Sequence, residues 1–317
     1  MATRSEVLEA CTDQPAEAVL ALAQTCAAAD RPTEMQMAYQ AVKHGNVALL
    51  RWLLHNATTP VSRGILLLEA ASARSQPCMQ AILDLGLDIN LANDPTGLRP
   101  STDRVGGVLH RALRSPRCPP DFFAWLLERG ADANAVETGA QRHILIYAMA
   151  HGDDDTAMPI VKLLLAYGAD VNRAKALHYV ASVNDIKKAR FLVEEAGANV
   201  DEPGVPEKDF YWERGPGTPL HTAVARGYSG ITGYLLKQGA SLDTRDAIKG
   251  MTPLEVAEDR WGPRSVITVL KLWRKKRQNN EPNAEKTPGE RGGHRLEQTD
   301  LEENGHALRN RCARAKD

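Results

Sequence analysis

The chain has 317 residues, and its 39 basic side chains nearly balance its 40 acidic ones, for a net charge of −1. A balanced charge provides no general attraction to phosphate backbones or anionic lipid, so neither nucleic acid nor a membrane surface is an expected partner. Hydrophobic residues make up 43% of the chain but aromatic residues only 5%, so the core must consist mainly of Leu, Ala, Val and Ile.

The N-terminal residues and the cysteines indicate an intracellular protein. Glu6 and Glu9 lie where a secretory signal would be apolar, and no later segment has the length needed to cross a bilayer. The five cysteines are widely spaced, which predicts neither a disulfide framework nor a zinc site. We therefore expect a cytoplasmic, monomeric protein with reduced thiols, no metal and no cofactor.

Short amphipathic helices are predicted along most of the chain. A degenerate helical pair over about 5–30 comes first, and a clearer pair follows over 38–54. Further along, five helical segments each end at a glycine that begins the pattern Gly-small-Asp-x-Asn or a variant of it. These glycines are Gly86, Gly130, Gly168, Gly197 and Gly239. A glycine takes positive φ without steric cost, so each is expected to end its helix in a left-handed cap.

A second kind of helix start is clearest at Thr218-Pro219-Leu220-His221. Thr218 can cap the helix, and Pro219 has the fixed φ that the first helical turn tolerates. A partial copy begins at Thr252-Pro253, and weaker ones contain His110 and His178. Helix starts and glycine marks thus alternate, which is the pattern of an internal repeat.

Residues 217–243 closely resemble the ankyrin-repeat family, and the resemblance extends over roughly 34–277. It implies an all-α repeat solenoid of stacked helix-turn-helix units with short β-hairpin fingers. It also implies that His110, His178 and His221 are structural, each bonding to neighbouring backbone. Because they occupy the same position in three different repeats, a shared metal site is not expected.

The repeats predict a division into three parts. Residues 1–33 are expected to form degenerate capping helices, because a terminal unit leaves one face in water. About seven repeats follow over 34–277, with insertions near 91–105 and 202–216 that lengthen surface loops. Residues 278–317 are charged and poor in large apolar residues, which predicts a disordered tail.

Recognition of another protein is the expected function, and we expect no enzymatic activity. By resemblance, a partner would lie across the concave face, and plain solvent-facing surface is the alternative for each residue there. The corresponding variable positions include Asn90, Val136, Glu137, Arg173, Thr244, Arg245 and Lys249. An alternative function is an enzymatic pocket in the irregular section of about 95–155, built from Arg99, Asp103, Arg104, His143 and His151.

Two further segments have two interpretations each. Phe210, Tyr211 and Trp212 are consecutive aromatics in the second insertion, where they are either exposed anchors for a partner or a satellite cluster over nearby helices. The basic cluster in 271–277 is either a nuclear import signal or a solvated helix end whose cations offset the helix dipole.

Overall fold

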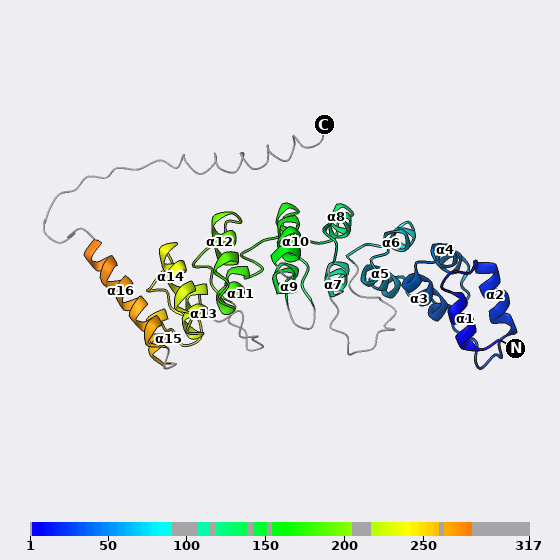
Figure 1. Ribbon diagram of the computed structural model, residues 1–317, viewed down its shortest axis with the longest axis horizontal. Helices are drawn as coiled ribbons and strands as arrows, with labels where there is room; N and C mark the ends of the chain where they lie inside the picture. Colours follow the sequence, from blue (N-terminus) through cyan, green and yellow to red (C-terminus); the bar gives the residue numbers. More distant parts are fainter. Residues whose placement is uncertain are drawn as a thin grey trace, which may run out of the picture. The chain divides into compact units, whose positions relative to one another are not determined.

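The computed structural model describes residues 2–90, 107–114, 118–137, 142–150, 154–204, 217–259 and 263–280 (Figure 1). Within these ranges the chain forms helices that follow one another in pairs. The pairs are α1 (Arg4–Ala10) with α2 (Ala16–Thr25), α3 (Glu34–His44) with α4 (Val47–Asn56), α5 (Arg63–Ser72) with α6 (Gln76–Leu83), α7 (Val108–Arg114) with α8 (Pro120–Glu128), α9 (Ile144–Ala150) with α10 (Asp154–Ala166), α11 (Ala176–Ser182) with α12 (Ile186–Glu194), α13 (Pro219–Ala225) with α14 (Ser229–Lys237), and α15 (Pro253–Asp259) with α16 (Arg264–Asn280).

The pairs stack in sequence order in two layers. From α1 to α15, the first helix of each pair contacts the first helix of the next pair. In Figure 1 the first helices from α3 to α13 lie along the lower side and the second helices from α4 to α14 along the upper side. Each pair therefore contacts mainly its two neighbours, and the predicted all-α repeat solenoid is confirmed.

A hydrophobic core runs between the two layers. Its largest fully buried side chains include Leu50 of α4, Leu67 of α5, Phe123 of α8 and Leu145 of α9. Burying one such side chain contributes about 1.5–3 kcal/mol, so no single repeat holds enough of them to fold alone. The core is aliphatic, as the low aromatic content requires.

The turns that join one pair to the next, called fingers below, differ from the predicted β-hairpins. Within the described ranges no strand forms, and one isolated β-bridge joins Val136 to His143. In the other described fingers, Asp and Asn side chains accept hydrogen bonds from backbone N–H groups that a strand ladder would use. The N–H of Asn172, for example, donates to Asp170 Oδ1 at 2.9 Å.

The chain divides into two compact units, residues 1–274 and 275–317. The three-part division inferred from the sequence stays a prediction, because residues 91–106 and 205–216 and the segment after 280 lie outside the described residues. Among the helices that the structure describes, none has the length and apolar character required to span a membrane.

Candidate functional site

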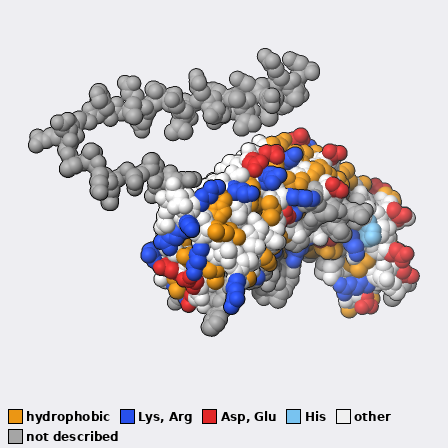
Figure 2. All heavy atoms as spheres, turned by 60° about the vertical axis from the view of Figure 1, so that its left-hand side comes forward, with side chains coloured by type: hydrophobic (Ala, Val, Ile, Leu, Met, Phe, Trp, Pro, Cys, Tyr) orange, Lys and Arg blue, Asp and Glu red, His pale blue; other side chains and the backbone are white. Residues whose placement is uncertain are grey.

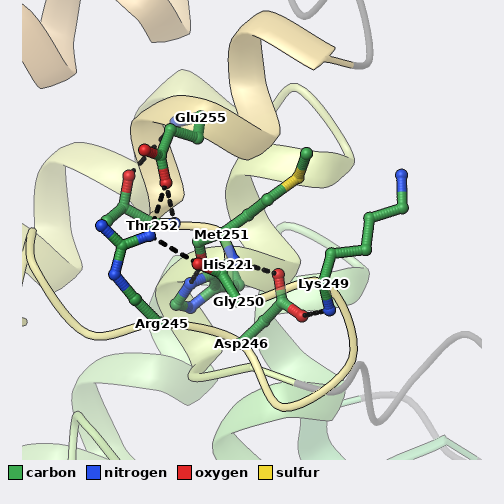
Figure 3. A network of polar contacts seen from close by, with 8 residues as sticks. All are labelled: His221, Arg245, Asp246, Lys249, Gly250, Met251, Thr252 and Glu255. Atoms are coloured by element: carbon green, nitrogen blue, oxygen red, sulfur yellow. Dashed lines mark hydrogen bonds and ion pairs between the residues drawn. The ribbon is translucent and has the colours of Figure 1, made fainter.

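His221 lies in the first turn of α13 and joins that repeat to the next one. The backbone N–H of Thr218 donates to His221 Nδ1 at 3.0 Å, and Nε2 donates to the carbonyl of Met251 at 3.0 Å. Figure 3 shows the ring next to Met251. Burial lowers the pKa of His221, although the bond to Met251 opposes this shift. A neutral ring with both nitrogens bonded acts as a structural link.

The other two motif histidines make the same link through Nε2. His178 in α11 donates to the carbonyl of Gly217 at 3.0 Å, and His110 in α7 lies 3.2 Å from the carbonyl of Arg142. Each acceptor lies in the segment that leads into the first helix of the following pair. Within the described ranges no cluster of His, Cys, Asp or Glu could hold a metal ion.

His178 differs from His221 at its second ring nitrogen. The residue three positions before His178 is Lys175, whose backbone is left-handed with φ 55°. The residue three positions before His221 is Thr218, whose backbone is extended. His178 Nδ1 is buried and has no hydrogen-bond partner in the described structure. Burial lowers the pKa of His178 to about 4, so the ring is neutral. Lys175 instead forms an ion pair with Glu202.

Neighbouring fingers are joined by a row of side chain to backbone hydrogen bonds, called the finger ladder below. In each rung an Asn or Asp side chain accepts from a backbone N–H of the next finger. The rungs join Asn90 Oδ1 to Asp132 N (2.7 Å), Asn134 Oδ1 to Asp170 N (2.8 Å), Asn172 Oδ1 to Asn199 N (2.9 Å) and Asp201 Oδ1 to Ser241 N (2.9 Å). The ladder fixes the position of each finger against its neighbour.

The residues predicted to bind a partner have different environments. The Asn90 side chain belongs to the finger ladder, and its amide also donates to the carbonyl of Gly130 at 2.8 Å. Glu137 was expected at the surface but is only 6% exposed, and its backbone N–H donates to the carbonyl of Arg142 at 2.9 Å. Arg173 is exposed. Partner binding by these residues stays a prediction.

The other predicted contacts, Thr244, Arg245 and Lys249, lie together in the finger between α14 and α15 (Figure 3). We call residues 243–251 the C-terminal finger. Arg245 Nη1 donates to the carbonyl of Gly250 at 2.6 Å and to Glu255 Oε2 at 3.2 Å. Lys249 Nζ forms an ion pair of 2.9 Å with Asp259. Thr244 is half-buried.

Asp246 organises the C-terminal finger. Its carboxylate accepts from the backbone N–H groups of Lys249 at 2.7 Å, Ile248 at 2.9 Å and Met251 at 3.1 Å. Burial alone would raise the pKa of Asp246, but these three donors outweigh it and lower the pKa. The charged carboxylate therefore adds to the two backbone hydrogen bonds of this finger, from the N–H of Asp246 to the carbonyl of Met251 and from the N–H of Gly250 to the carbonyl of Asp246.

Large exposed hydrophobic side chains gather on one side of the stack. We define the finger side as the surface formed by the first helices and the fingers. Of the six such residues in the described ranges, four lie there: Tyr39 on α3, and Val136, Tyr167 and Ile248 in turns that join one pair to the next. Val183 lies in the turn between α11 and α12, and Leu272 lies on α16. Figure 2 shows small hydrophobic patches between interspersed acidic and basic side chains on the face in view.

Sequence analysis missed Tyr39 and Ile248. Tyr39 lies near Glu69 of α5 and Arg111 of α7, which places it in a row of first-helix side chains. The signal for Ile248 was a large aliphatic residue in a finger whose side chains are mostly polar, between Asp246 and Gly250. The aromatic residues 210–212 lie outside the described ranges, and their exposure stays a prediction.

The residues of the enzymatic alternative are not brought together in the described structure. Of the five, only His143 is described; it is buried, and its Nδ1 accepts from the backbone N–H of Leu145 at 3.2 Å. An open cavity of about 510 Å³ lies at the first helix pair, lined by residues such as Glu9, Asp13 and Leu22, far in sequence from 95–155. No finding supports that alternative.

Comparison with known proteins identifies the repeats. Residues 109–203 match a family model of three ankyrin repeats, and residues 217–247 match a single ankyrin repeat. A search of curated protein sequences gave no match.

Similar solved structures include the human ASB11 ankyrin repeat domain (21% identity, TM-score 0.47), aligned over 74% of this chain and 96% of that one. An ankyrin repeat domain from Acinetobacter baumannii has 25% identity and a TM-score of 0.46 over 66% and 97% of the two chains. The ankyrin repeat domain of Bcl-3, described as a unique IkappaB family member, has 23% identity and a TM-score of 0.40 over 84% and 97%.

Proposed function

Because this chain is an ankyrin-repeat protein, we propose that it acts as a scaffold or adaptor, without enzymatic activity, that binds a protein partner on its finger side. Ankyrin repeats are generally protein–protein interaction modules. We further propose that the finger side is the surface that contacts the partner, and that the protein is a cytoplasmic monomer. Import into the nucleus through residues 271–277 is the alternative location.

The observation that supports this proposal is the uneven distribution of exposed hydrophobic side chains. Tyr39 lies on a first helix, and Val136, Tyr167 and Ile248 lie in fingers. When a partner covers exposed apolar side chains and removes them from water, the free energy of the system falls, which favours binding. Their spread over several repeats suits an extended contact better than a small-molecule pocket.

The test compares two matched double variants of the full chain. Tyr39→Ser with Val136→Ser removes a tyrosine and a valine from the finger side. Val183→Ser with Leu272→Ser removes a valine and a leucine from elsewhere. Proteins that co-purify with the tagged wild-type chain from its own cells are expected to be retained by the second variant and lost from the first.

Both variants should melt within a few degrees of the wild type, because the changed residues are exposed. Equal retention of every co-purifying protein by the two variants would contradict the assignment to the finger side. For the location, import of a fluorescent protein fused to residues 264–280 would favour the nuclear alternative.

A further inference from the structure

Ile248 is an exposed aliphatic side chain on a fixed loop. It is 61% exposed, and it lies at the C-terminal finger between Asp246 and Gly250. Isolated exposed hydrophobic residues are common on protein surfaces and need no explanation by themselves. Two properties of its surroundings distinguish Ile248, namely the rigidity of the finger and the charge around it.

The finger is held by bonds that do not involve the Ile248 side chain. Besides the three N–H groups bound by its carboxylate, Asp246 donates its own N–H to the carbonyl of Met251 at 2.8 Å. The same carbonyl accepts from His221 of α13, so the finger is attached to the preceding repeat (Figure 3). The backbone at Ile248 is therefore already ordered in the free protein. The loop loses little conformational entropy when a partner binds.

The charge around the finger is negative. Three cations, Arg245, Lys249 and Lys271, pair with Glu255, Asp259 and Glu258 at 3.2, 2.9 and 3.0 Å. Asp243 adds an exposed carboxylate and Asp246 a buried one, so the finger and α15, residues 243–259, carry five carboxylates against two cations, a net charge of −3. Such a surface repels anionic lipid and nucleic acid and attracts a protein surface rich in Lys or Arg.

We propose that the C-terminal finger is a preformed docking element whose Ile248 side chain enters an apolar pocket, rimmed by Lys or Arg, on a protein partner. This inference rests on the proposed function and specifies the partner's chemistry at one point of the finger side. The rest of the finger side supplies other contacts, so loss of Ile248 weakens binding without abolishing it.

Leu272 of α16 provides a matched control within the same chain. It is 62% exposed and aliphatic, like Ile248, but it lies on the surface of a helix next to Lys271. Neither side chain is buried, so a serine at either position should leave the melting temperature almost unchanged.

The first experiment identifies what lies against position 248. A photoreactive p-benzoylphenylalanine replaces Ile248 in one full-length chain and Leu272 in another, and both are irradiated in the protein's own cells. Position 248 is expected to crosslink to a protein, at an apolar segment whose nearest charged residues are Lys or Arg. Crosslinks to an acidic segment, to lipid or nucleic acid, or to the same targets from both positions would overturn the proposal, as would no crosslink from 248.

The second experiment measures affinity for the crosslinked partner, purified. Ile248→Ser should weaken binding about tenfold or more, since burial of an aliphatic side chain is worth at least that factor, while Ile248→Val should retain most of the affinity. Leu272→Ser should bind as the wild type does, and binding should weaken as ionic strength rises. Equal affinities for Ile248→Ser and Leu272→Ser would refute the inference.

The outcomes also separate this inference from the proposed function. If Tyr39→Ser with Val136→Ser abolishes binding while Ile248→Ser does not weaken it, the finger-side function stands and the docking element fails. If neither change weakens binding, both fail.

Discussion

The repeat of α13 and α14 and the repeat of α11 and α12 differ in how completely the ring of their buried histidine is hydrogen-bonded. Both start with a buried histidine whose Nε2 donates to a carbonyl of the next repeat. In the first repeat Thr218 also satisfies Nδ1, whereas in the second Lys175 leaves Nδ1 of His178 without a partner. One cap residue therefore decides whether the histidine is fully bonded.

The difference shows which part of the motif the stack requires. The bond from Nε2 joins two repeats, and it is present in both cases. The bond at Nδ1 lies within one repeat, and its loss is tolerated where the surrounding helices bury the ring. An unsatisfied buried acceptor is unfavourable by about 1–3 kcal/mol, so α11 and α12 should be the weaker of the two repeats.

The largest expected effect is a pH dependence from His178. Its folded pKa of about 4 lies below the ordinary 6.5, so the neutral ring contributes stability that is fully present above pH 6.5. That stability is lost as pH falls through this window toward 4, by about 2–3 kcal/mol. His178→Gln keeps a donor for Gly217 and cannot titrate there. Urea unfolding across this pH range should give a flatter curve for His178→Gln, and an unchanged slope would be evidence against the burial argument.

The next largest difference is expected when each histidine is replaced by leucine, because the two repeats should lose different amounts of stability. His221→Leu leaves the buried N–H of Thr218 without a partner and removes one of two donors to the carbonyl of Met251, which keeps the N–H of Asp246. The unfolding free energy should fall by about 2 kcal/mol. His178→Leu removes one of two donors to the carbonyl of Gly217, which keeps the N–H of Gly204, and it also removes an unsatisfied nitrogen, so a loss of less than about 1 kcal/mol is expected. Urea unfolding near neutral pH measures both. Equal losses would mean that the Nδ1 bond contributes nothing.

The turns between the paired helices should respond in opposite directions. Gly227 has φ 77°, and a Cβ there would lie 2.7 Å from Pro263 Cγ, so Gly227→Ala should destabilise the chain by about 2 kcal/mol. Asn184, with φ 58°, has the same left-handed conformation in the turn between α11 and α12. Asn184→Gly should therefore stabilise the chain by less than about 1 kcal/mol. Thermal melts of the two variants test this pair; a shift of the same sign in both would contradict it.

The smallest effect concerns Lys175 itself. Lys175→Ala loses the partly buried ion pair with Glu202 and keeps the left-handed backbone, so a loss of about 1 kcal/mol is expected. Lys175→Gly loses the same pair but relieves the backbone, so its stability should lie within about 0.5 kcal/mol of the wild type. If alanine and glycine are equally destabilising, the left-handed conformation at 175 is not a source of strain.

The sequence was sufficient for the fold class because the strongest signals are local. Thr218 and Pro219 start α13, and the Leu-rich segments with a following glycine define the second helices. The fingers were predicted less well. Side chains of Asp and Asn took over hydrogen bonds that hairpin strands would have made, and this competition depends on the neighbouring finger.

The candidate site was harder to predict because exposure depends on the packed stack. Glu137 and Asn90 looked like free surface residues, yet one is buried and the other bonds to the next repeat. Ile248 was not predicted, because the bonds that fix the finger around it form only in the folded stack. Burial and bonding between repeats are properties of neighbours that a single sequence does not place in space.

The finger ladder also bears on how such a protein can change over evolutionary time. Its rungs join residues separated by 42, 36, 27 and 40 positions in the chain, yet their lengths stay between 2.7 and 2.9 Å. The spacing of adjacent units is thus set by a local bond and is insensitive to the number of residues inserted between them. Loops can therefore lengthen or shorten in descendants of this gene without readjustment of the units on either side, which leaves those loops free to acquire new binding partners.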